Sequence, residues 1–540
     1  MDFINNNRWY WIAIAITALL SYGFTLTNYS VSVDDETIQT YAHGGVLLSQ
    51  GRFGSSHFLG LIFDAYDFLP FWLDFLGLII LVIAVVAWSI YFIRMSHGRL
   101  EKKFTIIFSC LLISFPVLAH LIIFMGALYS IGFSFLFTAV ALILFSSSLC
   151  NDKDVSSLCF IKTLNFKSLF KIIAAIILLA ISIGIFEWTP VLFLTGIFSG
   201  LLLEYICDDK GNKTMSSFKL FLFTCIIIII ILALAVILKE ILTWLYQNIN
   251  DIVPSGYTQN YMSWKVNTLL NDFPRFITTL FTVFFVDFFK GKDISLWLAV
   301  FDYSIIIELI IAVYLSIKNR SVIPFFIVIC LIGSAFSLNI ITGNVFLEAR
   351  TYVHLAIPIA FAFMVLTYLV YFENPTTIQG IPGYLLLSMQ KGIKIIVTIA
   401  VVLIILYQTK ELSRLFYFEY LRYEADTRTA YNIIYEIEKQ EGTLSKPVVF
   451  IGPFSGSANI RMGYIVFEHD RWSIPDRMVS PGRIIGFIAQ LGYNLHAVSS
   501  QSDLDKALFE SQKMPSYPKA GSIKVFDNFI IVKFGTPDAM

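Results

Sequence analysis

Three consecutive carboxylates, Asp34, Asp35 and Glu36, are the residues of this sequence best suited to do chemistry. They follow the first long apolar run, and Arg52 and His57 come after them before the second run begins. Carboxylates beside a bilayer are costly to desolvate, so a cluster of them requires an explanation. An ionised carboxylate within hydrogen-bond reach of a hydroxyl group can remove its proton. We therefore predict that Asp34 or Asp35 is a general base.

A structural role for the same cluster is compatible with catalysis. The stretch Ser32-Val33-Asp34-Asp35 has the spacing of a helix-capping motif, and acidic side chains are favourable at the positive end of a helix. Residues 36–50 carry apolar side chains at helical spacing, which predicts an amphipathic helix on the membrane surface that ends at Gly51. Two adjacent carboxylates can also hold a divalent cation through their oxygens. A cap would itself fix a carboxylate in place.

Cations in the predicted external segments are candidates for binding a phosphate. Arg52 lies in the Gly/Ser-rich stretch 50–57, and a planar guanidinium binds two phosphate oxygens at once. Arg350 begins a later apolar run, where a lipid phosphate would be a natural counter-ion. Lys265 and Arg275 lie in a long aromatic-rich segment and are further candidates. The alternative roles are interfacial snorkelling for Arg52 and an interfacial aromatic belt for the long segment.

Other residues in these segments are candidates for binding a sugar. Glu187 and Trp188 occupy a tight turn between two apolar runs, where a carboxylate can accept sugar hydroxyls and an indole offers an apolar stacking face. Glu348 is a third candidate, although it could instead pair with the arginine two residues further on. The remaining candidates for contacts with an acceptor are Glu36 and His57.

The composition is that of a membrane protein. Of the 540 residues, 57% are hydrophobic and 14% are charged, whereas soluble domains carry roughly 25% charged residues. The net charge of zero provides no field that would attract nucleic acid, so no such partner is expected. The six cysteines form no CxxC pair, which argues against a zinc site or a disulfide framework. No cofactor is predicted beyond the option of a divalent cation.

Eleven apolar runs are long enough to cross a bilayer, which needs about 20 residues. They lie at approximately 9–29, 70–93, 104–124, 129–149, 168–187, 189–207, 219–238, 294–317, 322–342, 351–372 and 393–410. A shorter run, 276–289, carries Asp287 and is interpreted as interfacial or re-entrant. Lysine and arginine are concentrated in the segments that are cytoplasmic if the N-terminus is inside, so we predict N-in, C-out topology.

Residues 411–540 have a different pattern, with shorter apolar runs, more charge and more turn residues. They predict a small external α/β domain with a helix at 427–440, a strand at 448–451, a helix at 482–493 and a hairpin of 522–526 with 529–534. We therefore divide the chain into a transmembrane catalytic domain, 1–410, with external loops 30–69, 239–293 and 343–350, and an external domain, 411–540.

In this layout the chain resembles the GT-C class of membrane glycosyltransferases, which place an acidic motif in the first external loop beside an amphipathic helix. Within that class it is most similar to the GtrII-type O-antigen glucosyltransferases, which convert bacterial serotypes. The residues that carry the resemblance are Ser32–Glu36, Gln50–Phe53, Arg350 and the hairpin strand Gly521–Val525. The sequence shows no phosphate loop and no dinucleotide fingerprint, which agrees with a lipid-linked donor rather than a nucleotide sugar.

The resemblance implies a reaction and a location. Such enzymes sit in the bacterial inner membrane with the active site facing the periplasm. They move glucose from undecaprenyl-phosphate glucose to a sugar of the O-antigen repeat on its own lipid carrier. By this analogy Asp34 or Asp35 is the base, and Arg52 and Arg350 stabilise the leaving lipid phosphate. A single displacement would invert the anomeric configuration, from a β-linked donor to an α-linkage. Glu187 and Glu348 are also carried over as sugar contacts.

Three other functions fit part of the pattern: a flippase or transporter for lipid-linked oligosaccharides, an O-antigen polymerase, and a transferase of another sugar. Transporters commonly show internal repeats and charges within their spans. Here the predicted spans are nearly free of charge, no repeat is visible, and the charges lie in external loops. The sequence therefore favours an enzyme in contact with membrane lipids over a translocation path.

Overall fold

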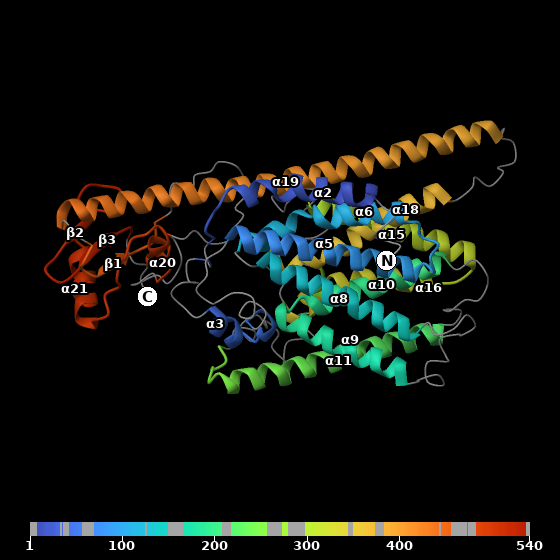
Figure 1. Cartoon of the computed structure of the whole chain (residues 1–540), viewed down its shortest axis with the longest axis horizontal. Helices are drawn as coiled ribbons and strands as arrows, with labels where there is room; N and C mark the ends of the chain where they lie inside the picture. The colour runs from blue at the N-terminus through green and yellow to red at the C-terminus, as the bar shows by residue number, and fades with distance from the viewer. Residues whose placement is uncertain are drawn as a thin grey trace.

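The computed structural model describes residues 8–32, 35, 43–56, 70–124, 127–149, 166–207, 218–255, 273–278, 297–343, 349–372, 383–441, 444–454, 472 and 482–535. A bundle of helices forms one end of the molecule and a small domain with a β-sheet forms the other (Figure 1). One very long helix, α19 (Gly383–Glu441), runs along the bundle and continues into the sheet domain.

The bundle consists of long apolar helices joined by short elements. Its long helices are α2 (Arg8–Thr27), α5 (Pro70–Met95), α6 (Lys102–Ile113), α8 (Ala127–Leu149), α9 (Phe166–Ile185), α10 (Thr189–Cys207), α11 (Phe218–Ile249), α15 (Trp297–Asn319), α16 (Ile323–Ala335) and α18 (Ala356–Phe372). The short elements are α3 (His43–Ser49), η2 (Pro116–Leu118), α7 (Ala119–Ile122), α17 (Ser337–Thr342) and η5 (Ala349–Leu355).

Among the described residues, nine helices are long and apolar enough to cross a membrane. One of them, Lys102–Ile122, comprises α6, η2 and α7. The nine helices coincide with nine of the predicted runs. The predicted run 294–317 corresponds to α15, which has 23 residues. The predicted run 322–342 is divided at Phe336 into α16, of 13 residues, and α17. The total of eleven spans stays a prediction, and most of the short run 276–289 lies outside the described residues.

Close packing of backbones holds the bundle together where small residues face a neighbouring helix. A Cβ atom on Gly77 of α5 would lie 2.6 Å from the backbone nitrogen of Tyr129 in α8. A Cβ on Gly132 of α8 would lie 2.9 Å from the side chain of Ile80. Glycine therefore permits the approach of α5 and α8, as small residues do at helix contacts in membranes.

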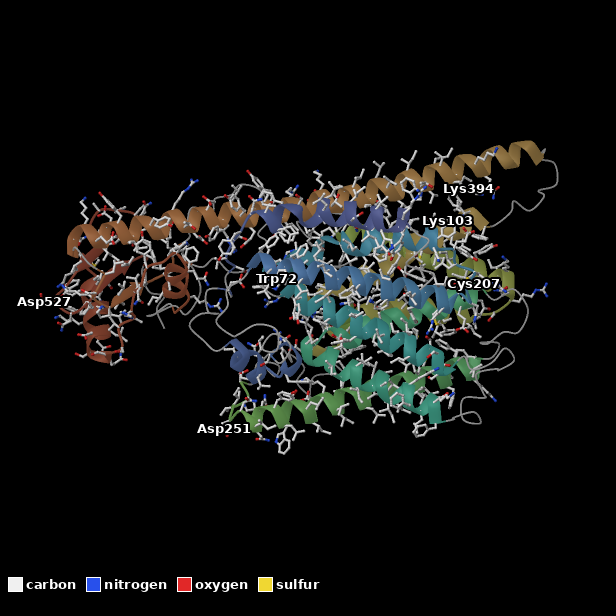
Figure 2. The ribbon with its side chains drawn as sticks, in the orientation of Figure 1. Trp72, Lys103, Cys207, Asp251, Lys394 and Asp527 are labelled. Carbon is white, nitrogen blue, oxygen red and sulfur yellow. The ribbon has the colours of Figure 1, made fainter. Side chains whose placement is uncertain are left out.

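Labelled residues distinguish the two ends of the bundle. Figure 2 shows Lys103, Lys394 and Cys207 toward the end remote from the sheet domain, and Trp72 and Asp251 toward the end that faces it. The two labelled lysines belong to segments predicted to be cytoplasmic. Their shared end is therefore consistent with the predicted orientation, in which the sheet domain is external.

The sheet domain contains a three-stranded sheet in the order β1-β3-β2. Strand β1 (Val448–Ile451) is parallel to β3 (Ile530–Lys533), which is antiparallel to β2 (Ile523–Val525). The predicted strand and hairpin are thus confirmed. The predicted helix 482–493 is observed as α20 (Gly482–Gln490), and α21 (Gln501–Ser511) was not predicted.

The last turns of α19 form part of the core of this domain. Ala430, Ile433, Ile434 and Ile437 are buried against the sheet and α20, which confirms the predicted amphipathic face of 427–440. The helix is continuous through residue 410, where we placed the boundary between the two domains. That division of the chain stays a prediction, since no break in secondary structure marks it.

Candidate functional site

Asp35 is buried, with 3% of its surface exposed, and forms a tight turn with Ser32. Its Oδ2 atom accepts a hydrogen bond from the backbone N–H of Ser32 at 3.0 Å, and its own N–H donates to the Ser32 carbonyl at 3.2 Å. In a capping box, the side chain of the acidic residue accepts a hydrogen bond from the backbone N–H of the capping residue, and Asp35 makes this contact with Ser32. We call this feature, defined by Ser32 and Asp35, the acidic turn.

The sheet domain holds the acidic turn in place. The Nε2 atom of Gln490, the last residue of α20, donates a hydrogen bond of 2.8 Å to the backbone carbonyl of Asp35. Val31, next to the turn, is buried in the same apolar cluster as Ile434 and Phe487. The acidic turn is therefore packed against residues that lie more than 390 positions further along the chain.

A second carboxylate, Asp74, lies near the start of α5 and interacts electrostatically with Asp35. Its Oδ1 atom is buried and has no hydrogen-bond partner among the described residues. We did not predict a role for Asp74. The signal in the sequence was a lone carboxylate in the first turns of an apolar run, where a charge is costly.

Arg52 and Glu187, which we predicted to have separate roles, form an ion pair. The Nε atom of Arg52 lies 3.0 Å from Oε1 of Glu187, and the two side chains are partly exposed. The guanidinium group also lies over the ring of Phe186, at 5.9 Å from its centre. A partly exposed pair of this kind contributes about 0–1 kcal/mol, so an anionic ligand can displace the carboxylate at little cost.

The segment around Arg52, residues 48–56, is fitted closely against α9, and we call it the cation segment. Phe53 covers Gly184, where a Cβ atom would lie only 2.3 Å from the Phe53 ring. The hydroxyl of Ser55 donates a hydrogen bond of 3.0 Å to the carbonyl of Ile185. These contacts fix the residues that follow Arg52. The ion pair with Glu187 places the Arg52 guanidinium at the turn between α9 and α10.

Helix α11 supplies a second cation to the same place. The ammonium group of Lys239 lies 3.3 Å from the position that a Cβ atom of Gly51, the residue before Arg52, would occupy. Lys239 is 8% exposed, and its Nζ atom lies 3.0 Å from Oε1 of Glu240. Gln247 anchors the same segment by donating to the carbonyl of Leu48 at 2.8 Å.

The predicted sugar contact Trp188 lies in the apolar core. It is 4% exposed and is stacked on Phe186, with ring centres 5.3 Å apart. Its Nε1 atom is buried and has no hydrogen-bond partner among the described residues. The structure thus places Trp188 beneath Phe186, and a direct contact with a sugar stays a prediction.

The other predicted cations lie in separate elements. Arg350 is in η5, with its guanidinium 5.7 Å from the centre of the Phe124 ring. Arg275 is exposed in the helical stretch 273–278, which is attached to the bundle through buried Phe276.

Five predicted site residues lie outside the described residues, so their places in the site stay predictions: Asp34, Glu36, His57, Lys265 and Glu348. Within the part of the chain that the structure describes, no group of three or more His, Cys, Asp or Glu residues is suitable for a metal ion.

Comparison with known proteins gives one match to a family. The model of the family described as "Glucosyl transferase GtrII" matches residues 23–367, which is more than half of the chain. The match includes both the acidic turn and the cation segment. Among curated protein sequences, none matches this chain.

Among solved structures, the chain is similar to the oligosaccharyltransferase of Archaeoglobus fulgidus. The form tethered to an acceptor peptide shares 13% identity over 76% of this chain and 56% of that protein, with a TM-score of 0.39. The form in complex with an inhibitory peptide and a dolichol-phosphate shares 12% identity over 75% of this chain and 56% of that protein, with a TM-score of 0.36. The chain thus spans little more than half the length of these archaeal proteins, and these TM-scores are too low to establish a common fold.

Proposed function

The chain belongs to the GtrII glucosyl transferase family, and from this we propose that it transfers glucose from undecaprenyl-phosphate glucose to a sugar of a lipid-linked O-antigen repeat. The family and the long apolar helices of the bundle identify a membrane glycosyltransferase. We further propose that the active site faces the periplasm across the bacterial inner membrane.

The observation that carries the proposal is the arrangement of the first external segment. The same segment carries a buried carboxylate, Asp35, and a guanidinium, Arg52, that is paired with a displaceable carboxylate. A transferase with a phosphate leaving group needs a base for the acceptor hydroxyl and positive charge for the departing oxygen. The acidic turn and the cation segment supply groups of these two kinds.

In the proposed reaction, Asp34 or Asp35 removes the proton of an acceptor hydroxyl as its oxygen attacks the anomeric carbon of the donor glucose. The bond from that carbon to the phosphate oxygen breaks on the opposite face. The sugar is thereby inverted from a β- to an α-linkage, and undecaprenyl phosphate leaves. Arg52 stabilises the charge that develops on the leaving phosphate, and Arg350 is proposed to assist.

The proposal assigns Glu187 two successive contacts. Before the donor binds, its carboxylate neutralises Arg52. When the donor phosphate takes its place, the carboxylate becomes available to accept a hydroxyl of the transferred sugar. Oligosaccharide contacts of Glu36, His57 and Glu348, and phosphate contacts of Lys265 and Arg275, belong to the same proposal.

The experiment is the mass of the O-antigen repeat in a bacterial host that makes undecaprenyl-phosphate glucose, with and without this chain. We expect a gain of one hexose per repeat, and no gain with an Asp34→Asn/Asp35→Asn variant present at the same level in the membrane. A change in chain length at unchanged repeat mass would contradict the proposal and indicate a polymerase. A gain of another sugar mass would contradict the assignment of the donor.

A further inference from the structure

We propose that Lys239 and Arg52 together bind the phosphate of the isoprenoid lipid donor, as a pair of cations at the outer boundary of the membrane. This inference rests on the proposed function, because it names a residue that would bind the donor of that reaction. Lys239 belongs to a helix far from the acidic cluster in the sequence, and the packing of α11 against the cation segment brings it to Gly51, the residue before Arg52.

The position of Lys239 along α11 places it at the depth of a lipid phosphate. An uninterrupted run without charge separates Lys219 from Lys239. At about 1.5 Å per residue, these 20 positions span about 30 Å, which is the thickness of the hydrocarbon core. With Lys219 at the inner boundary, Lys239 lies at the outer one, where the phosphates of bilayer lipids are found.

Lys239 faces the protein instead of the lipid. Its neighbours Val236, Ile237 and Ile241 are exposed on the outer face of α11, whereas Ala235, Lys239 and Thr243 are buried on the opposite face. A lysine at a membrane boundary ordinarily extends its ammonium group into the headgroup region. The inward direction of Lys239 brings its charge to the bundle, where burial of an ammonium is favourable only with an anion close by.

The geometry around Gly51 brings Lys239 to the residue that precedes Arg52 in the chain. Gly51 has a φ of +87°, in the region that favours glycine, and its missing side chain leaves room for the Lys239 ammonium. Among the described residues, Glu187 lies within ion-pair distance of Arg52, and Glu240 lies within ion-pair distance of Lys239. The side chain of Glu240 is 65% exposed, so this carboxylate can move into water when another anion arrives.

The charges fit the leaving group better than the donor. A phosphodiester donor carries one negative charge, and the phosphomonoester that departs approaches two. A pair of cations therefore interacts more strongly with the leaving phosphate than with the bound donor, and only such a difference accelerates the chemical step. The exposed aliphatic face of α11, beside Lys239, offers a surface along which the isoprenoid chain can lie within the bilayer.

The test uses the purified full-length chain in lipid nanodiscs and undecaprenyl phosphate as the probe. We expect Lys239→Gln to weaken binding by about tenfold or more, as loss of one charged contact implies. Lys219→Gln removes a lysine from the other end of the same helix and serves as the matched control, with unchanged binding expected. Lys239→Arg should retain binding to within about threefold, which would show that charge rather than folding is at issue.

Three results would overturn the inference. The first is binding by Lys239→Gln equal to that of the wild type. The second is equal displacement of the probe by phosphatidylglycerol, which would identify the pair as a contact for ordinary bilayer lipid. The third is absence of binding to the wild-type chain. If Lys239→Gln binds the probe and transfers hexose as the wild type does, the inference fails and the proposed function stands. If the wild-type chain binds the probe tightly but transfers no hexose, the binding site stands and the proposed function fails.

Discussion

The acidic turn and the cation segment belong to the same predicted external segment, yet different parts of the chain hold them. The acidic turn is held by the sheet domain, through the side-chain amide of Gln490 in α20 and the apolar core around Val31. The cation segment is held from the bundle, by contact of Phe53 with Gly184 and by α11. The position of the proposed base thus depends on the sheet domain, and the position of the proposed phosphate contact depends on packing between the helices of the bundle. Perturbing either anchor should affect a different step of the reaction.

The largest effect is expected at the acidic turn itself. Asp35→Asn retains an oxygen that can accept from Ser32, so the turn is preserved while the negative charge is lost. If Asp35 is the base, hexose transfer falls by about 10²- to 10⁴-fold. If Asp34 is the base, Asp34→Asn has that effect instead. The measurement is the rate of transfer in membranes that contain equal amounts of each variant. Full activity of both single variants and of the double variant would contradict the assignment of the base.

A smaller effect is expected from a single methyl group under the cation segment. Gly184→Ala places a Cβ atom at 2.3 Å from the Phe53 ring, so the ring and Arg52 must shift. Overpacking of this kind costs about 1–3 kcal/mol, and we expect a lower melting temperature together with weaker binding of undecaprenyl phosphate. Gly333→Ala is the matched control, because a Cβ there has no neighbour within 4 Å. Equal behaviour of the two variants would mean that Phe53 does not hold the segment.

The anchor of the acidic turn should affect transfer and leave binding of the lipid unchanged. Gln490→Ala removes the hydrogen bond to the Asp35 carbonyl, which is worth about 1 kcal/mol, so transfer should fall by about fivefold. Binding of undecaprenyl phosphate should not change. Gln501→Ala is the control, since Gln501 is exposed and its side chain contacts Asp505 in its own helix. A loss of lipid binding in Gln490→Ala would contradict the separation of the two anchors.

The smallest effect is expected at Glu187. In Glu187→Gln the competing carboxylate is removed from Arg52, so undecaprenyl phosphate should bind about two- to fivefold more tightly. Transfer should not rise in proportion, because the proposed contact with the sugar hydroxyl is weakened at the same time. The measurement is a binding isotherm beside a transfer rate. Weaker lipid binding in this variant would show that Glu187 supports the arginine rather than competing for it.

The elements that the sequence predicted well are those with strong local patterns. The apolar runs that became α9 and α10 have about the length of a span, and short apolar stretches bounded by turn residues predicted the strands at 448–451, 522–526 and 529–534. The acidic cluster and Arg52 were singled out because charge beside a bilayer is costly, and their roles stay predictions. The helix α19 was predicted as two separate pieces, because residues 393–410 are predominantly apolar and residues 427–440 are amphipathic. The backbone is nevertheless one continuous helix.

The contacts within the site could not be predicted in the same way. The ion pair between Arg52 and Glu187 joins residues 135 positions apart, and the bond from Gln490 to Asp35 joins residues 455 positions apart. Such pairs depend on how helices pack, which a single sequence does not specify. Lys239 was assigned only to an external loop, because the pattern of hydropathy records its charge but not the face of α11 on which it lies.

The continuity of α19 would couple the thickness of the membrane to the position of the sheet domain. Its 59 residues form a rod of about 88 Å, of which about 45 Å extends beyond the apolar stretch toward the sheet domain. A spanning helix changes its tilt to match a thinner or thicker bilayer. Over that length, a change of about 10° in tilt displaces the outer end by about 8 Å. The lipid composition around the bundle would thereby change the position of Gln490, whose side-chain amide holds the acidic turn, because α19 connects the bundle to the sheet domain as one continuous helix.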